Sequence, residues 1–327
     1  MKYSLMSLMV NDELKVKKPN FIHMTMMKEF GYEGENPTVE EVFEFLNGHG
    51  VPIKNGSMTF EDYVKFAKDA GYDGIDMMDF HLETEGKEAK QILEQYGITL
   101  SSVNIIIPFA NAKTKSKFET MLGRAKCLIS HAHEAGCRNV LLMPSVYTVD
   151  ADVTREDAFH NMVNGLKACV DYGEEMGISI STETLESIAV PYCSCGEMER
   201  IFQAVRKLKY THDTGNPLTA LENPAEVYEI FKDRTVSVHF KDFAYSTAED
   251  GILCNDGKKV VSVPFGEGAV DFRKHYDMLL RDGYKGFITI EGSVPADNSL
   301  DGAVKSLQYF KEMEREEREK RWGGKPE

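Results

Sequence analysis

The sequence predicts a (β/α)8 TIM barrel, and three observations favour this fold. Short β-branched or apolar runs recur eight times along the 327 residues. Each run is followed by a longer stretch in which the apolar residues have helical spacing. No linker or low-complexity segment divides the chain, and eight strand–helix units in about 300 residues match the size of one closed barrel. We therefore expect a single α/β domain over residues 1–327, built on a parallel sheet.

The expected strands and helices alternate in order along the chain. The strands are expected at residues 3–10, 74–79, 100–107, 139–143, 178–183, 208–213, 235–241 and 286–291. The helices that follow them are expected at residues 59–70, 85–95, 113–135, 154–176, 196–207, 224–232, 272–282 and 300–321, and residues 300–327 form a C-terminal helix and tail. Five of these helices end in a glycine suited to a left-handed cap, at Gly71, Gly97, Gly136, Gly177 and Gly283. A doubly wound open sheet is the alternative, but it usually has a glycine-rich turn after the first strand, and residues 9–12 contain no glycine.

Two segments exceed what a minimal barrel needs, and both follow strands. Residues 11–58 form a long loop after the first strand and include a short helix at residues 38–47. Residues 243–264 follow the seventh strand and are expected to form a hairpin that turns at Asp256-Gly257. Both segments belong to the C-terminal face, where the active sites of such barrels lie. Each is therefore either a lid or partner surface, or a decoration without function.

Composition argues against several classes of protein. The 53 acidic residues outnumber the 38 Lys and Arg, and the net charge of −15 argues against nucleic acid as a partner, because phosphate binding needs a basic surface. The longest apolar runs, such as residues 103–110, are far shorter than the roughly 20 residues of a membrane-spanning helix. The N-terminal residues are typical of a first strand and not of a signal peptide. Six scattered cysteines indicate a reduced, cytoplasmic protein.

Four strand ends carry side chains that bind hard metal ions. Glu183 ends the fifth strand, Asp213 the sixth and Glu291 the eighth, and His239 lies near the end of the seventh. Side chains on four successive strands would meet on one side of the barrel mouth. Singly, each could be a salt-bridge partner or a turn residue, but clustered carboxylates without a cation would repel one another. The set favours one divalent ion, with Mn²⁺ first, Mg²⁺ or Co²⁺ as alternatives, and Zn²⁺ less favoured.

The motifs around these residues resemble those of the xylose isomerase-like TIM barrels, in the sugar phosphate isomerase/epimerase superfamily. The similarity covers roughly residues 60–315. Its motifs are STET at residues 181–184, HDTGN at 212–216, VHFKD at 238–242, FGEGAVDF at 265–272 and GYKGFITIE at 283–291. The resemblance implies that the four residues hold the metal. It also implies an enediolate mechanism in which Glu183 and Glu291 exchange protons on opposite faces of a sugar.

The resemblance points first to a sugar isomerase or epimerase that removes a proton next to a carbonyl. Two residues depart from the epimerase pattern: Asn216 stands where many members have His, and Tyr245 stands where some epimerases have Arg. These departures and the long first loop favour, as an alternative, a metal-dependent β-elimination lyase on 3-oxo-glycosides. Such an enzyme would be similar to the large subunit of a bacterial C-glycoside deglycosidase, or to a related dehydratase. A further alternative is a non-catalytic barrel that binds a sugar or a partner.

Other residues close to the strand ends are candidates for the site. His81 and Lys241 are candidate catalytic groups, although His81 can equally be a solvated loop residue and Lys241 an ion-pair partner of Asp242. Candidate substrate-binding residues are His212, Asn216, Asn104, Glu267 and His23. His212 can instead point away from the mouth, because neighbours alternate along a strand. The expected partners are a carbohydrate or oxo-sugar substrate, and either further copies of the chain or a small accessory subunit.

Overall fold

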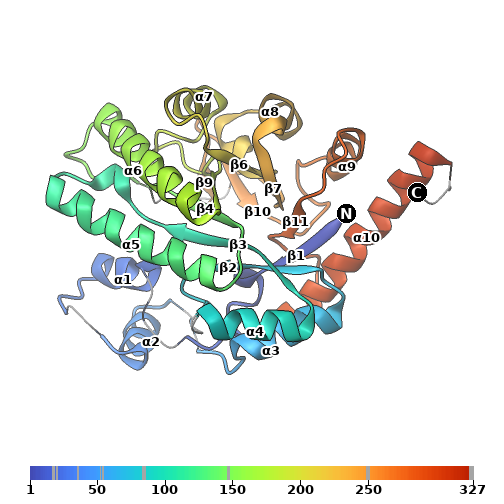
Figure 1. Ribbon diagram of the computed structural model, residues 1–327, viewed down its shortest axis with the longest axis horizontal. Coiled ribbons are helices and arrows are strands. Elements are labelled where there is room, and N and C mark those ends of the chain that lie inside the picture. Colours follow the sequence, from blue (N-terminus) through green and yellow to red (C-terminus); the bar gives the residue numbers. More distant parts are fainter. Residues whose placement is uncertain are drawn as a thin grey trace.

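Eight parallel strands close into a barrel in the computed structural model, which describes residues 1–16, 19, 21–34, 37–51, 53, 55–82, 86–145, 148–247 and 251–323 (Figure 1). The barrel strands are β1 (Lys2–Met6), β2 (Gly74–Met78), β3 (Thr99–Ile106), β4 (Asn139–Met143), β5 (Ser179–Thr182), β6 (Lys209–Asp213), β7 (Thr235–Phe240) and β11 (Phe287–Ile290). Each pairs in parallel with the barrel strands before and after it, and β11 closes the ring on β1. This confirms the predicted TIM barrel.

The helices form a layer around the strands, as Figure 1 shows. They are α1 (Phe21–Glu29), α2 (Val39–Gly48), α3 (Phe60–Ala70), α4 (Gly86–Tyr96), α5 (Lys115–Glu134), α6 (Arg155–Met176), α7 (Cys195–Ala204), α8 (Pro224–Phe231), α9 (Phe272–Arg281) and α10 (Ser299–Trp322). Every expected helix forms, with ends that differ from the prediction by at most three residues. Capping explains the accuracy: the side chain of Thr59, for example, accepts a hydrogen bond from the backbone N of Asp62 and begins α3. Residues 324–327 of the predicted tail lie outside the described residues.

The first strand is shorter than predicted. It ends at Met6, and residues 7–10 turn into a short 3₁₀ helix. The hydroxyl of Ser7 accepts a hydrogen bond from the backbone N of Met78, at 3.0 Å, where the extended chain would otherwise continue. This side-chain contact replaces strand pairing beyond Met6, and no run of apolar residues could have indicated it.

The long loop after β1 is a small folded unit with its own apolar cluster. It contains the predicted helix α2 and the unpredicted helix α1, which pack around the buried side chains of Met27, Val42 and Leu46. The two ends of the loop meet, because the backbone N of Lys15 donates to the carbonyl of Met58 at 2.9 Å. Figure 1 shows α1 and α2, in blue, grouped together beside the barrel.

The segment after β7 forms the predicted hairpin, with one more strand. Strands β9 (Ile252–Leu253) and β10 (Lys259–Ser262) pair in an antiparallel manner around a turn that contains Gly257, whose φ is +81°. Strand β8 (Phe243–Ser246) pairs with the other edge of β10. Residues 248–250 of this segment lie outside the described residues.

The inside of the barrel is unusually polar. Barrel interiors are mostly filled by branched apolar side chains, but here Ser4, Asp76, Ser102, Thr211 and Thr289 are fully buried on the strands. Asp76 of β2 receives a hydrogen bond from Thr289 of β11, although these strands are not neighbours, so the contact crosses the interior. The apolar core lies mainly between the strands and the helices. The polar interior ends at the C-terminal mouth, directly below the predicted site.

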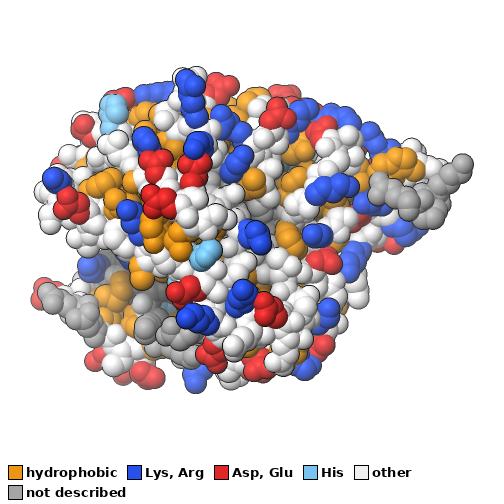
Figure 2. Space-filling model, in the orientation of Figure 1, with side chains coloured by type: hydrophobic (Ala, Val, Ile, Leu, Met, Phe, Trp, Pro, Cys, Tyr) orange, Lys and Arg blue, Asp and Glu red, His pale blue; other side chains and the backbone are white. Residues whose placement is uncertain are grey.

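The outer surface carries charges of both signs. On the face shown in Figure 2, Lys and Arg side chains are interspersed with Asp and Glu side chains. Within the part of the chain that the structure describes, no helix has the length and apolar character that a bilayer crossing requires.

Two glycines test the capping account of the fold. Gly177 ends α6 with φ +69°, and Gly123 lies on the exposed surface of α5 with helical geometry; nothing lies within 4 Å of a Cβ added at either position. Gly177→Ala should lower the free energy of unfolding by about 1–2 kcal/mol, since the left-handed region is strained for alanine. Gly123→Ala should raise it by about 0.5–1 kcal/mol. Urea denaturation of both variants measures this, and shifts in the same direction would contradict the account.

Candidate metal centre

Four ionisable side chains converge at the C-terminal mouth of the barrel. Glu183 follows β5, Asp213 ends β6, His239 lies on β7 and Glu291 follows β11. Asp213 and His239 are direct partners in the register of β6 and β7, so their side chains emerge at the same height. One potential ligand atom each from Glu183, Asp213 and His239 lies within 4.8 Å of the others. Glu291 joins them, with Oε2 at 3.0 Å from Nδ1 of His239.

Two carboxylate oxygens in this cluster are buried without a hydrogen-bond donor, namely Oε2 of Glu183 and Oδ2 of Asp213. The other oxygen of Asp213 accepts hydrogen bonds from the backbone N of Gly215 and of Asn216, both at 2.7 Å, which turns Oδ2 towards the cluster. A buried carboxylate oxygen without a donor is costly, and a cation would relieve that cost. Three carboxylates and one imidazole are donors that fit a hard divalent ion.

The environment separates the pKa values of the three carboxylic acids. Burial raises the pKa of Glu183 well above its usual value, and it raises that of Asp213 to about 6. Burial acts in the same direction on Glu291, but the Lys241 ammonium and the hydrogen bond to His239 outweigh it and hold the pKa of Glu291 at about 2. Negative charge is therefore well compensated at Glu291 and poorly compensated at Glu183.

Lys241 brings a mostly buried positive charge into the cluster. It lies two residues after His239 and so points to the same side of the chain. Its Nζ is 2.8 Å from Oε1 of Glu291, 3.3 Å from Oδ1 of Asn216 and 3.6 Å from Oε1 of Glu186. Burial alone would lower the pKa of Lys241, but the nearby carboxylates outweigh it and hold the pKa well above its usual value. The predicted site residues Lys241 and Asn216 therefore do lie at the cluster.

Glu186 was missed by the sequence analysis. It is buried, it lies three residues after Glu183, and its carboxylate faces the Lys241 ammonium. The signal was a second acidic residue soon after the end of the fifth strand. Because many loops contain such a residue, the sequence could not separate it from an ordinary surface side chain.

Asp242 points away from Lys241 and holds a loop. Its carboxylate accepts hydrogen bonds from the backbone N of Gly266, Gly268 and Val270, at 2.9, 3.1 and 3.3 Å. A Cβ on Gly268 would lie 2.0 Å from Oδ1 of Asp242, so the Gly-Glu-Gly sequence lets the loop approach this carboxylate. Glu267, a predicted substrate-binding residue, is exposed to solvent on the same loop.

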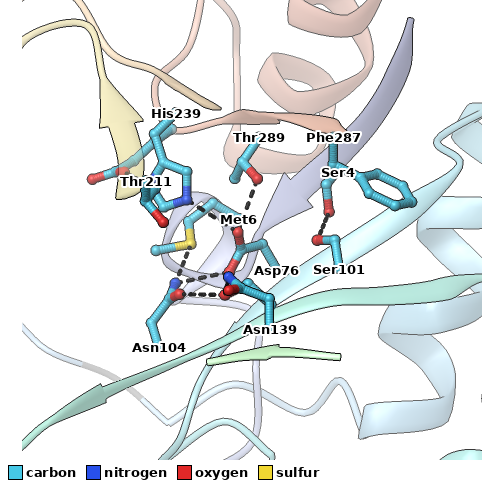
Figure 3. A network of polar contacts seen from close by, with 12 residues as sticks. Ser4, Met6, Asp76, Ser101, Asn104, Asn139, Thr211, His239, Phe287 and Thr289 are labelled. Carbon is cyan, nitrogen blue, oxygen red and sulfur yellow. Dashed lines mark hydrogen bonds and ion pairs between the residues drawn. The ribbon is translucent and has the colours of Figure 1, made fainter. Parts of the chain in front are cut away.

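A buried carboxylate, that of Asp76, lies below His239, as Figure 3 shows. Oδ2 of Asp76 is 3.2 Å from Nε2 of His239, in an ion-pair contact that is not aligned as a straight hydrogen bond. Asn104 and Thr289 donate to the same carboxylate, each at 2.8 Å. Asn104 therefore supports Asp76 from below, whereas the sequence analysis expected it to bind substrate. Asp76 itself was missed, although it is the one charged residue in the buried run 74–78.

His81 has ring nitrogens that are both occupied by protein partners. Nδ1 lies 2.9 Å from the hydroxyl of Ser7, and Nε2 lies 3.0 Å from Oδ1 of Asn11. Burial, with a smaller effect from His23, lowers the pKa of His81 to about 3. These contacts give His81 a structural position after β1 and β2, and they do not support the predicted catalytic role.

Two further predicted substrate contacts lie away from the cluster. His212 precedes Asp213, and because strand neighbours alternate it points outwards, where its ring lies 5.4 Å from that of Tyr228 on α8 and 5.5 Å from that of His275 on α9. His23 is on α1, with its ring 5.5 Å from that of Phe43 on α2. The structure therefore does not bring His212 or His23 to the four expected ligands.

Comparisons with known proteins agree with this geometry. The profile of the family described as xylose isomerase-like TIM barrel matches residues 64–313. The chain is 25% identical to an inosose dehydratase from Lacticaseibacillus casei over 165 residues, which are 47% of this chain and only 54% of the relative's length. It is 23% identical to an inosose dehydratase from Geobacillus thermodenitrificans over 282 residues, covering 80% of this chain and 92% of the relative. The structure of an L-ribulose 3-epimerase has the same fold, with a TM-score of 0.66 at 12% identity over 83% of this chain and 96% of the other.

The ligand assignment predicts which substitution removes a bound metal. His239→Gln should weaken binding of Mn²⁺ by more than about 100-fold, since even partners of metal ligands contribute 10- to 100-fold. Asn216→Ala should keep wild-type binding, because the contact of Asn216 with Asp213 uses its backbone N. Titration calorimetry of both folded variants with Mn²⁺ measures this. Equal affinity of His239→Gln and the wild type would refute the assignment.

Proposed function

The chain belongs to the xylose isomerase-like TIM barrel family, and from its site we propose that it is a divalent-metal-dependent dehydratase of a polyhydroxylated ketone. In this proposal a proton next to the carbonyl is removed, an enediolate forms, and a hydroxyl on the next carbon leaves as water. One observation carries the proposal: the cluster holds both a carboxylate with an oxygen that has no hydrogen-bond donor, Glu183, and an ammonium that can donate a hydrogen to a leaving oxygen, Lys241.

The four ligands that we assign to the metal are Glu183, Asp213, His239 and Glu291. When bound, a divalent ion would polarise the substrate carbonyl and offset the negative charge that develops on its oxygen. The predominance of carboxylate oxygens favours Mn²⁺, with Mg²⁺ and Co²⁺ as alternatives. A single imidazole makes Zn²⁺ a weaker candidate, since catalytic zinc usually has more histidine ligands.

In this proposal, the carboxylate of Glu183 removes the proton next to the substrate carbonyl. This carboxylate has two oxygens, so one can hold the metal while the other takes the proton of the substrate. Burial raises the pKa of Glu183 well above its usual value, and this makes its carboxylate a stronger base than an exposed one. The electron pair of the broken C–H bond becomes the C=C bond of the enediolate.

The leaving hydroxyl takes its proton from Lys241. Collapse of the enediolate restores the carbonyl, forms a C=C bond to the neighbouring carbon and breaks the C–O bond there. The Nζ of Lys241 gives a proton to the departing oxygen, so that water and not hydroxide leaves. Asn216 and Glu186 fix the ammonium in position through their contacts with Nζ at 3.3 and 3.6 Å.

Epimerisation shares the first half of this reaction and is the second candidate, favoured by the similarity in fold to an L-ribulose 3-epimerase. It needs a group that returns a proton to the opposite face of the same carbon. Glu291 is the carboxylate available for that, but the Lys241 ammonium and the hydrogen bond to His239 hold its pKa at about 2, so it is a poor proton carrier. The similarity to the inosose dehydratases described above also supports elimination.

The proposal predicts the products from three classes of substrate. An inosose (a cyclic polyhydroxy ketone), a 3-oxo-glucoside and a free ketohexose are each incubated with the protein and Mn²⁺ in D₂O, and the products are identified by mass spectrometry and NMR. The inosose should lose one water. Release of the aglycone from the oxo-glucoside would also support elimination and would redirect the substrate assignment. Turnover of the ketohexose alone, to its epimer, would contradict the proposal.

Lys241→Met separates the two halves of the reaction. It should lower the elimination rate by about 100-fold or more, because the general acid is lost. Exchange of the proton next to the carbonyl with deuterium should continue in recovered substrate, since Glu183 is intact. Glu183→Gln is the matched control and should abolish both exchange and elimination. If Lys241→Met abolishes exchange as completely as elimination, Lys241 is not the acid for the leaving group.

A further inference from the structure

Asp76 lies among buried polar side chains inside the barrel, below His239 (Figure 3). It is fully buried on β2. Its contacts come from three other strands: Asn104 on β3, His239 on β7 and Thr289 on β11. Because β2 pairs only with β1 and β3, the contacts to His239 and Thr289 cross the inside of the barrel.

The surroundings of Asp76 consist of donors. Oδ1 accepts a hydrogen bond from Nδ2 of Asn104 at 2.8 Å, and Oδ2 accepts one from the hydroxyl of Thr289 at 2.8 Å. Nε2 of His239 is the third polar group, at 3.2 Å from Oδ2. A buried carboxylate needs such partners, and a carboxylate can only accept hydrogen bonds. Nε2 of His239 therefore faces an acceptor, and a hydrogen on this nitrogen would be stabilised by the Asp76 carboxylate even without a straight hydrogen bond.

A chain of hydrogen bonds fixes the direction in which Asn104 faces. Nδ2 of Asn139 donates to the hydroxyl of Ser102 at 3.2 Å, and that hydroxyl donates to Oδ1 of Asn104 at 3.1 Å. The amide oxygen of Asn104 is thereby occupied, and its amide nitrogen is left for Asp76. Asn104 and Thr289 both donate to the Asp76 carboxylate, and these hydrogen bonds hold it below His239.

The opposite nitrogen of His239 faces the cluster. Nδ1 makes a hydrogen bond with Oε2 of Glu291 at 3.0 Å and lies 3.8 Å from Oε2 of Glu183. A bound cation would take the place of the hydrogen on Nδ1. We propose that Asp76 is a positioning residue that keeps the N–H of His239 at Nε2, so that the lone pair at Nδ1 points at the metal. A carboxylate behind a metal-binding imidazole orients the ring and fixes its tautomer. This inference rests on the proposed metal site and deepens it.

The experiment measures metal affinity without substrate, in the wild type, in Asp76→Asn and in Glu314→Gln. Glu314 is the matched control, because it is also a buried carboxylate, with Oε2 2.6 Å from the Tyr3 hydroxyl in a network that does not involve the cluster. In Asp76→Asn, one carboxylate oxygen is replaced by an amide NH2 group, which cannot accept a hydrogen bond. The ring of His239 then loses its acceptor, or competes for the remaining oxygen with Asn104 and Thr289. By calorimetry with Mn²⁺, Asp76→Asn should bind about 10- to 100-fold more weakly than the wild type, and Glu314→Gln should bind like the wild type.

A second readout reports the tautomer directly. Protein labelled with ¹⁵N-histidine and loaded with Zn²⁺, as a diamagnetic probe, is measured by two-bond ¹H–¹⁵N NMR. In the wild type the hydrogen of His239 should reside on Nε2 and the metal on Nδ1. A hydrogen on Nδ1 in the loaded wild type would overturn the inference, whatever the affinities.

The affinities distinguish failure of this inference from failure of the proposed function. If the wild type binds Mn²⁺ and Asp76→Asn binds it equally well, the positioning role is refuted and the metal site stands. If Glu314→Gln loses as much affinity as Asp76→Asn, the loss reflects a general weakening of the fold, and the inference also fails. If the wild type binds no divalent cation, the metal-dependent function and this inference fall together.

Discussion

The whole site depends on the neutralisation of negative charge that the fold concentrates at one buried point. The ends of β5, β6 and β11 bring Glu183, Asp213 and Glu291 to the same mouth, where they are largely shielded from bulk water. Uncompensated carboxylates in such a place repel one another and lose their hydration. The imidazole of His239 and the ammonium of Lys241 compensate part of this charge. Two carboxylate oxygens without donors remain, and we propose that the cation binds there.

Because the negative charges are compensated unequally, Glu183 and Glu291 have different roles in the proposed reaction. Glu291 lies between His239 and Lys241 and is held as a carboxylate, while Glu183 retains an oxygen with no partner. A symmetrical pair of carboxylic acids would suit proton transfer to and from both faces of one carbon. A base opposite an ammonium instead suits the removal of a proton and a hydroxyl from neighbouring carbons. Deeper in the barrel, the Asp76 carboxylate is likewise compensated, by hydrogen bonds from Asn104 and Thr289 and by its contact with His239.

The sequence predicted the barrel and the proposed metal ligands because both follow regular sequence patterns. Apolar runs indicate strands, such as residues 139–143. Once the strands are known, the fold places residues at their ends, such as Asp213, at the mouth of the barrel. Contacts across the barrel follow no such pattern. The contacts of Asp76 come from His239 and Thr289, which are far away in the chain. The hydrogen bond from Asn104 to Asp76 likewise has no signal in the sequence. His81 resembled a catalytic residue in sequence, and only its contacts with Ser7 and Asn11 reveal a structural role.

The central claim is that one divalent cation is bound by the four strand-end residues, through Nδ1 of His239. Anomalous X-ray diffraction from crystals of the protein grown with Mn²⁺, recorded on both sides of the manganese absorption edge, tests it most directly. The account predicts one dominant anomalous peak, within bonding distance of Glu183, Asp213, Glu291 and Nδ1 of His239. No peak at the mouth of the barrel, or a peak bound through Nε2 of His239, would contradict it.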